Sequence, residues 1–115
     1  MKTEILKAIE ALTPLTKEQI AEQVDCLSSF LPEKIVERIK TTQATPDEVA
    51  KWYKPYFHRT AEQAMTDFER AKGEDVKPAK AKVFLLISIY YHYSDCMEEQ
   101  FAERLVNFYL NKTKG

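Results

Sequence analysis

The apolar residues of this chain recur at steps of three and four, which is the period that gathers side chains on one face of an α-helix. Three such stripes fill the first third of the sequence: Ile5, Ile9 and Leu12, then Ile20, Val24, Leu27 and Leu31, then Ile35 and Ile39. β-Branched residues never alternate with polar ones over a run, as they would in a half-buried strand. Because each stripe must be covered by a neighbour, the pattern predicts several helices that pack on one another.

The composition supports the same fold class. The chain has only 2 glycines in 115 residues, against an average share of about 7%, so tight turns between strands are poorly supplied. Hydrophobic residues make up 44% and charged residues 30%, a balance typical of globular proteins and unlike that of disordered or membrane-spanning chains. A chain of this length buries one core. We therefore predict a single all-α domain over residues 1–115, a compact bundle of five or six helices.

Threonines mark the predicted starts of helices. Each stands three residues before a glutamate or glutamine that can bond back to it, and the segments are Thr16–Gln19, Thr45–Glu48 and Thr60–Gln63. This reciprocal arrangement satisfies two backbone N–H groups that a helix start would otherwise leave without an acceptor. Pro46 strengthens the second segment, because proline fits the first helical position at no cost in hydrogen bonds.

Prolines and one glycine mark the predicted boundaries. Pro14 and Pro32 separate the early helices, and Gly73 is a natural left-handed stop. Pro55 is expected to end a helix, because proline cannot donate to the preceding turn and its ring clashes with that turn. Pro78 then restarts the chain.

The last stretch of apolar residues has two interpretations. From Val83 to Phe108 the steps of three and four continue without interruption, which favours one long or kinked C-terminal helix that acts as the central packing element. Against this, the segment Asp95–Glu98 could cap a new helix, which would break the stretch near Tyr93.

The segment 51–59 is unusually rich in aromatic and basic side chains. If one helix ends at Pro55 and the next begins at Thr60, residues 54–59 form a short exposed corner. Aromatic and arginine side chains in such a position are typical of interface hot spots. The candidate partner-binding residues are Trp52, Lys54, Tyr56, Phe57, His58 and Arg59. The opposing interpretation is that the rings fold under the corner and close the end of the bundle.

These features lead to the expectation of a small cytosolic protein that acts by binding another protein, as inhibitors, immunity proteins, adaptors and small subunits do. The aromatic members of the segment would be the desolvated anchors. The basic members would supply charge-assisted hydrogen bonds to an acidic partner surface. A homodimer is a further interpretation, because the stripe from Val83 to Phe108 is long enough to need cover from a second copy.

Charge is divided unevenly along the chain. Residues 1–50 carry six basic and nine acidic side chains, whereas residues 51–82 carry eight and five. Lys77, Lys80 and Lys82 lie near a predicted helix start, where cations oppose the helix dipole and a bound anion would explain them. The runner-up function is a nucleic-acid accessory protein that uses Lys51, Lys54, Arg59 and the lysines from Lys72 to Lys82 along one surface. A net charge of −1 disfavours it, because affinity for a duplex comes largely from neutralised phosphates.

Other classes of function have little support in the sequence. The longest uncharged run, Val83–Ser94, has twelve residues, short of the roughly 20 that a bilayer crossing needs, and no secretory signal is expected. Cys26 and Cys96 belong to no paired motif. The two histidines, His58 and His92, occur in no Glu-x-x-His pair of the kind that helical metal sites use. With no glycine-rich phosphate loop and no nucleophile motif, we expect no cofactor, no metal and no catalysis.

Overall fold

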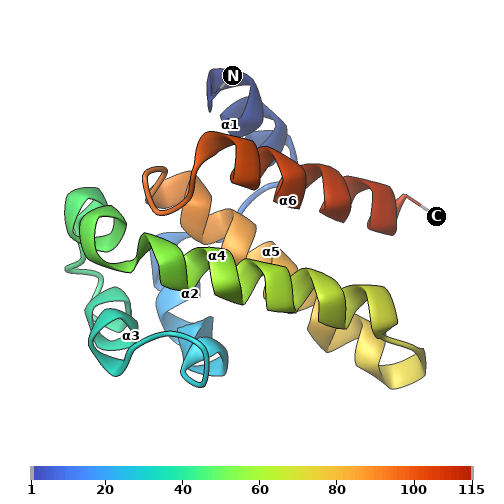
Figure 1. Cartoon of the computed structure of the whole chain (residues 1–115), viewed down its shortest axis with the longest axis horizontal. Coiled ribbons are helices and arrows are strands. Elements are labelled where there is room, and N and C mark those ends of the chain that lie inside the picture. Colours follow the sequence, from blue (N-terminus) through green and yellow to red (C-terminus); the bar gives the residue numbers. More distant parts are fainter. Residues whose placement is uncertain (1, 115) are drawn as a thin grey trace.

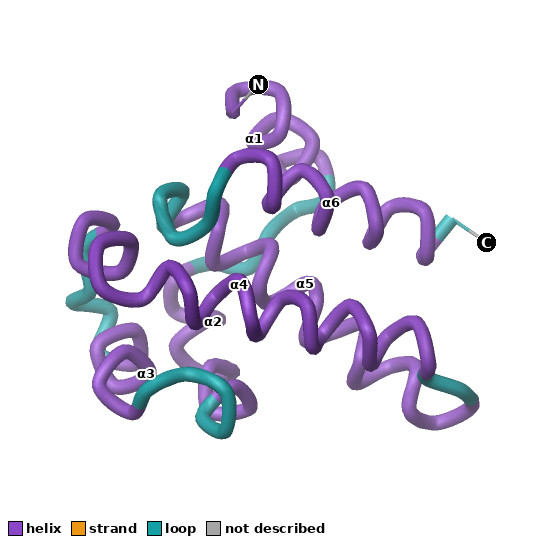
Figure 2. The backbone as a smooth tube through the Cα atoms, in the orientation of Figure 1, coloured by secondary structure: helices purple, strands orange, loops and turns teal. Residues whose placement is uncertain are grey.

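The computed structural model describes residues 2–114, and all of their side chains except those of residues 2, 46 and 50–53. Every regular element in this range is helical, and the connections between the elements are short (Figures 1 and 2). The elements are α1 (Lys2–Ala11), α2 (Lys17–Gln23), the 3₁₀-helix η1 (Val24–Leu27), α3 (Glu33–Lys40), α4 (Pro46–Arg70), the 3₁₀-helix η2 (Gly73–Asp75), α5 (Val76–His92) and α6 (Glu99–Thr113). The predicted all-α bundle is confirmed.

The first two predicted helix starts are present. The Thr16 hydroxyl accepts a hydrogen bond from the Gln19 N–H at 3.1 Å, and the Thr16 N–H donates to the Gln19 side chain at 2.9 Å. Thr45 and Glu48 form the same reciprocal pair, with both distances at 3.3 Å. These caps are local, so the sequence pattern was sufficient to place them.

The predicted break at Pro55 and the predicted start at Thr60 are both wrong. Helix α4 continues through Pro55 to Arg70, and the buried Thr60 hydroxyl donates to the Tyr56 carbonyl one turn earlier. A proline inside a helix costs about 3 kcal/mol. Burying a large apolar side chain stabilises by about 1.5–3 kcal/mol, and the continued helix buries three of them, Phe57, Met65 and Phe68, together with Ala61 and Ala64. Packing therefore outweighs the proline, and the exposed corner does not form.

Helix α5 lies at the centre of the bundle. It contacts α1, α2, α4 and α6 (Figure 1), and its residues 85–90 are all buried. A helix that is apolar on every side must be covered on every side, which is why this segment occupies the core. The central position predicted for the C-terminal stretch is found in this helix.

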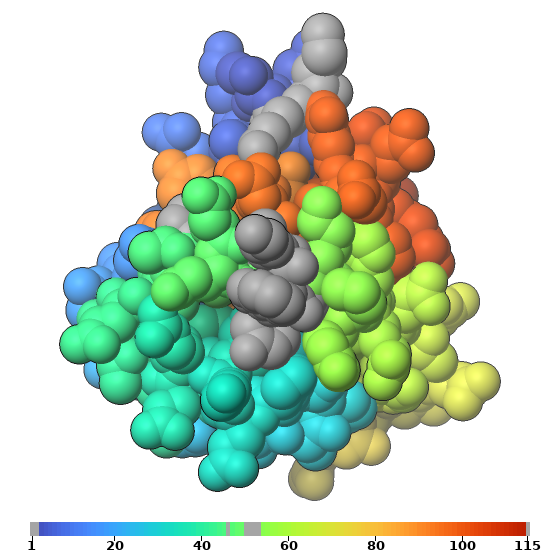
Figure 3. Space-filling view, turned by 60° about the vertical axis from the view of Figure 1, so that its left-hand side comes forward, coloured from blue at the N-terminus to red at the C-terminus, as the bar shows by residue number. Residues whose placement is uncertain are grey.

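The C-terminal stretch forms two helices, α5 and α6, that are joined by a sharp turn. Helix α5 is capped by Tyr93 and α6 by Glu98, so the break near Tyr93 is present, although the new cap is not Asp95. Because the chain reverses direction between α5 and α6, α6 packs against the bundle. It buries four residues that a straight extension of α5 would leave in water: Ala102, Leu105, Val106 and Tyr109. Helices α1 and α6 end up together at one end of the molecule (Figures 1 and 3).

Candidate interaction site

Helix α4 distributes the six predicted partner-binding residues over different faces. Because they lie on a helix and not in a corner, successive side chains turn by about 100°. Tyr56 and Arg59 are exposed, Lys54 and His58 are half-buried, and Phe57 is buried. The side chain of Trp52 lies outside the described residues.

Phe57 corrects the prediction most clearly. Its side chain is 0% exposed, so it cannot be an anchor that a partner covers. The reason is helical register: Phe57 shares a stripe with Ala61, Ala64 and Phe68, on a helix that packs on α5 and α6. For this ring, the opposing interpretation that the aromatic residues close the bundle is the correct one.

Tyr56 and Arg59 form an exposed pair one turn apart on α4. The Tyr56 ring is 36% exposed, and the guanidinium carbon of Arg59 lies 5.5 Å from its centroid. At this distance the cation is attracted to the face of the ring. Two of the three residue types that most often dominate binding energy are thus presented side by side on a regular helix.

His58 and Lys54 point toward α6 and are engaged within the molecule. The Glu98 N–H donates to His58 Nε2 at 3.0 Å, and Lys54 Nζ lies 3.1 Å from Glu98 Oε1. The His58 ring also stacks on Phe101, with centroids 4.4 Å apart and planes 12° from parallel. Both side chains therefore fasten α4 to the start of α6, whereas their sequence context predicted contacts with a partner.

The surroundings of His58 favour the neutral ring. Burial lowers the pKa of His58 below its usual value, and the Lys54 ammonium acts in the same direction. The carboxylates of Glu98 and Glu62 oppose this effect without overcoming it. A neutral ring agrees with the hydrogen bond, because a backbone N–H needs an acceptor.

The three lysines near the start of α5 lie in different environments. Lys77 and Lys80 are exposed, but Lys82 is half-buried, with Nζ 4.9 Å from the centroid of Phe30. Asp75 occupies the N-cap position of α5 and Glu74 precedes it, so carboxylates already complement the helix dipole.

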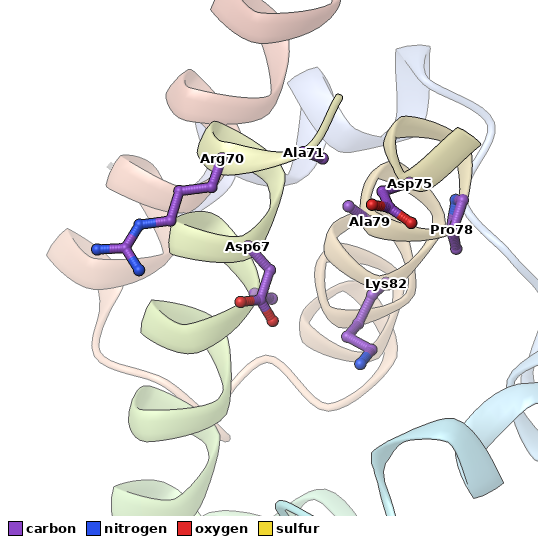
Figure 4. A pocket seen from close by; sticks show the side chains of 8 residues that line it. Asp67, Arg70, Ala71, Asp75, Pro78, Ala79 and Lys82 are labelled. Atoms are coloured by element: carbon purple, nitrogen blue, oxygen red, sulfur yellow. The ribbon is translucent and has the colours of Figure 1, made fainter. Parts of the chain in front are cut away.

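A hollow of about 360 Å³ lies beside this helix start, between the end of α4 and the beginning of α5 (Figure 4). Its charged lining is mixed in sign: Asp67 on α4 lies across it from Lys82 on α5, Asp75 lies at the start of α5, and the Arg70 side chain extends away from α5. Such a lining offers no single charge for an anion or a cation to match.

A second histidine contact was missed in the sequence. His92, at the end of α5, hydrogen-bonds through Nε2 to the Leu15 carbonyl at 2.8 Å. The Leu15 N–H donates to the buried Ser88 hydroxyl at 3.0 Å, so α5 holds both backbone groups of this residue. The contacts join positions 77 and 73 residues apart, which no local pattern could reveal.

Burial raises the pKa of Tyr90 to about 12, and it also raises the pKa of the fully buried Cys96 thiol, so both groups stay protonated near neutral pH. Within residues 2–114, the described His, Cys, Asp and Glu side chains nowhere form a group of three or more that could hold a metal ion.

Comparisons of the chain with protein-family models, with curated proteins and with solved structures find no match. Among the described helices, none combines the length and the apolar character that a membrane crossing requires.

Proposed function

We propose that this protein acts in the cytosol by binding another protein through the outward face of α4, without a cofactor and without catalysis of its own. The observation that carries the proposal is the exposed Tyr56–Arg59 pair. Tyrosine buries a large area with only two side-chain torsions to fix, and both tyrosine and arginine can make polar contacts at the rim of an interface.

The charges around the pair favour an acidic partner surface. Two neighbouring cations already have carboxylates: Lys54 lies 3.1 Å from Glu98, and Arg104 lies 3.6 Å from Glu62. Among the described residues, Arg59 contacts the Tyr56 ring but forms no ion pair. A carboxylate of the partner would therefore find in Arg59 a guanidinium available for a charge-assisted hydrogen bond.

The rigidity of α4 supports the same function. The opposite face of the helix is held in the core by Phe57, Ala61, Ala64 and Phe68. A partner would meet the pair already in place, and the entropic cost of ordering a loop on binding would be absent.

A photo-reactive amino acid at position 56 tests the proposed face in living cells. The matched control places it at position 110, because Leu110 and Tyr56 have the same exposed fraction of 36%. We expect a covalent adduct with a different protein at position 56 and none at position 110, read by mass spectrometry. Equal adducts at both positions, no adduct, or an adduct of two copies of this chain would contradict the proposal.

The charge of the pair is then tested with the captured partner in purified form. Arg59→Ala should weaken binding at least about fivefold, which corresponds to about 1 kcal/mol, and should leave the thermal midpoint unchanged. Arg70→Ala is the matched control, since Arg70 is an exposed arginine on the last turn of the same helix. An equal loss of affinity in both variants would show that only general charge matters.

A further inference from the structure

The hydrogen bond between His58 and Glu98 can form in one protonation state only. A backbone N–H can donate but not accept, so Nε2 of His58 must offer its lone pair at 3.0 Å, and Nδ1 carries the ring proton. The imidazolium form has a hydrogen on both nitrogens. Protonation would therefore set two N–H groups against each other across a contact that now holds the two helices together.

The position of this contact adds to the effect. Glu98 is the N-cap residue of α6, and its own side chain makes no capping hydrogen bond to the helix. The start of a helix carries a partial positive charge, so an imidazolium here would be a cation beside the positive end of a dipole. The stacked Phe101 ring, in the first turn of α6, holds the imidazole of His58 against this end.

The charged groups that face His58 come from three elements, and they are already matched. Lys54 and Glu62 lie on α4, Glu98 lies in the turn before α6, and Arg104 lies on α6. Lys54 pairs with Glu98, and Arg104 pairs with Glu62. A protonated His58 would add a third cation to this group. The two carboxylates, Glu98 and Glu62, already have cationic partners.

We propose that His58 is a proton-sensitive latch, which in its neutral form fixes the start of α6 on α4 and on protonation releases the α5–α6 turn and the first turn of α6. The rest of α6 stays in place, because Leu105, Val106 and Tyr109 remain buried against the bundle. The proposal is independent of the partner-binding function proposed above.

The direction of the pH response follows from the lowered pKa of His58 in the folded protein. In the unfolded chain the ring titrates near its usual pKa of about 6.5, so between the two values the unfolded chain binds more protons. The stabilisation that the His58–Glu98 contact provides is therefore complete above about pH 6.5. It is lost as the pH falls toward the pKa of His58 in the folded protein.

Hydrogen–deuterium exchange of the full chain tests the latch. After correction for intrinsic exchange rates, protection of residues 94–103 should fall between about pH 7.5 and about pH 5.5, by no more than about tenfold for each pH unit, which is the limit for one proton. Protection within residues 83–90, at the buried centre of α5, should stay constant. Unchanged protection of residues 94–103 would overturn the proposal.

Two variants separate His58 from the carboxylates around it. His58→Gln keeps an acceptor for the Glu98 N–H but cannot be protonated in this range, so the acid-induced loss of protection should disappear. His92→Gln is the matched control and should leave that loss in place. If the loss persists in His58→Gln, a carboxylate is responsible and the latch is wrong.

A second measurement requires no variant. In an NMR titration of the wild-type protein, the His58 ring and the Glu98 amide should report the same midpoint, below the usual histidine value of about 6.5. Separate midpoints would mean that the amide does not respond to the ring, and the proposal would fail.

Discussion

The two histidines of this protein perform similar structural tasks with opposite chemistry. Each uses Nε2 to hold a backbone group of a distant connection: His58 contacts the Glu98 N–H at 3.0 Å, and His92 contacts the Leu15 carbonyl at 2.8 Å. The first must accept, and the second must donate. An imidazolium can still donate, so acid breaks the first contact and leaves the second intact. The backbone partner, and not the histidine, decides the response to pH.

The two connections also differ in how firmly they are held. Helix α5 holds Leu15 through both backbone groups, since Ser88 accepts from its N–H while His92 bonds to its carbonyl. Glu98 is held through its N–H by His58 and through its exposed side chain by Lys54. An exposed ion pair contributes at most about 1 kcal/mol, so the Glu98 connection depends more strongly on its histidine.

The largest effect is expected from Ser88→Ala, which would leave the Leu15 N–H without its acceptor. The Ser88 hydroxyl is 0% exposed and Leu15 is half-buried, and a donor that loses its partner away from water costs about 1–3 kcal/mol. The free energy of unfolding from urea titration measures this loss. Ser29→Ala, at an exposed serine, is the control and should change it little. An equal loss of unfolding free energy in both variants would mean that the Ser88 hydroxyl does not hold Leu15.

The next largest effect separates the two histidines directly. His92→Ala should lower the free energy of unfolding by about 0.5–1.5 kcal/mol, and the loss should persist at about pH 5.5 because the imidazolium donates as well as the neutral ring does. His58→Ala should cost a similar amount at about pH 7.5, and little at about pH 5.5 if the contact is already broken there. The same pH dependence in both variants would remove the distinction between the two contacts.

The smallest effect concerns strain in the connection that His92 holds. Thr13 precedes it with a φ of 57°, a left-handed conformation that β-branched residues rarely adopt. Thr13→Gly should stabilise the protein by about 0.5–1 kcal/mol, because relief of strain exceeds the added freedom of the unfolded chain. Thr41→Gly is the control: its φ is −83°, so glycine there should lower the melting temperature. A lower melting temperature for Thr13→Gly would show that the backbone at Thr13 is not strained.

Local signals in the sequence predicted local features of the fold. The caps at Thr16 and Thr45 join residues three positions apart, so the segment contains both partners. The left-handed conformation of Gly73 was also predicted, and its φ is 60°. The signals at Pro55 and Thr60 were equally local but failed, because the burial of the stripe that begins at Phe57 outweighs them.

The candidate site was predicted in composition but not in orientation. The sequence identified Tyr56 and Arg59 among six candidates, but it placed them in a corner, where neighbouring side chains could all point outward. On a continuous helix, Phe57 turns into the core and His58 turns toward α6, while Tyr56 and Arg59 remain exposed. The wrong boundaries at Pro55 and Thr60 therefore changed the expected environment of Phe57 and His58, but not that of Tyr56 and Arg59.

The sequence by itself determined that this chain is helical, where two of its helices begin, and that an aromatic and basic segment precedes residue 60. Those properties depend on residues within one or two turns of each other. Only the tertiary structure decided that α4 passes through Pro55, that Phe57 is buried, and that His58 and His92 reach connections 40 and 77 residues away. The physical reason is that burial and long-range hydrogen bonds depend on which surfaces meet in the folded chain.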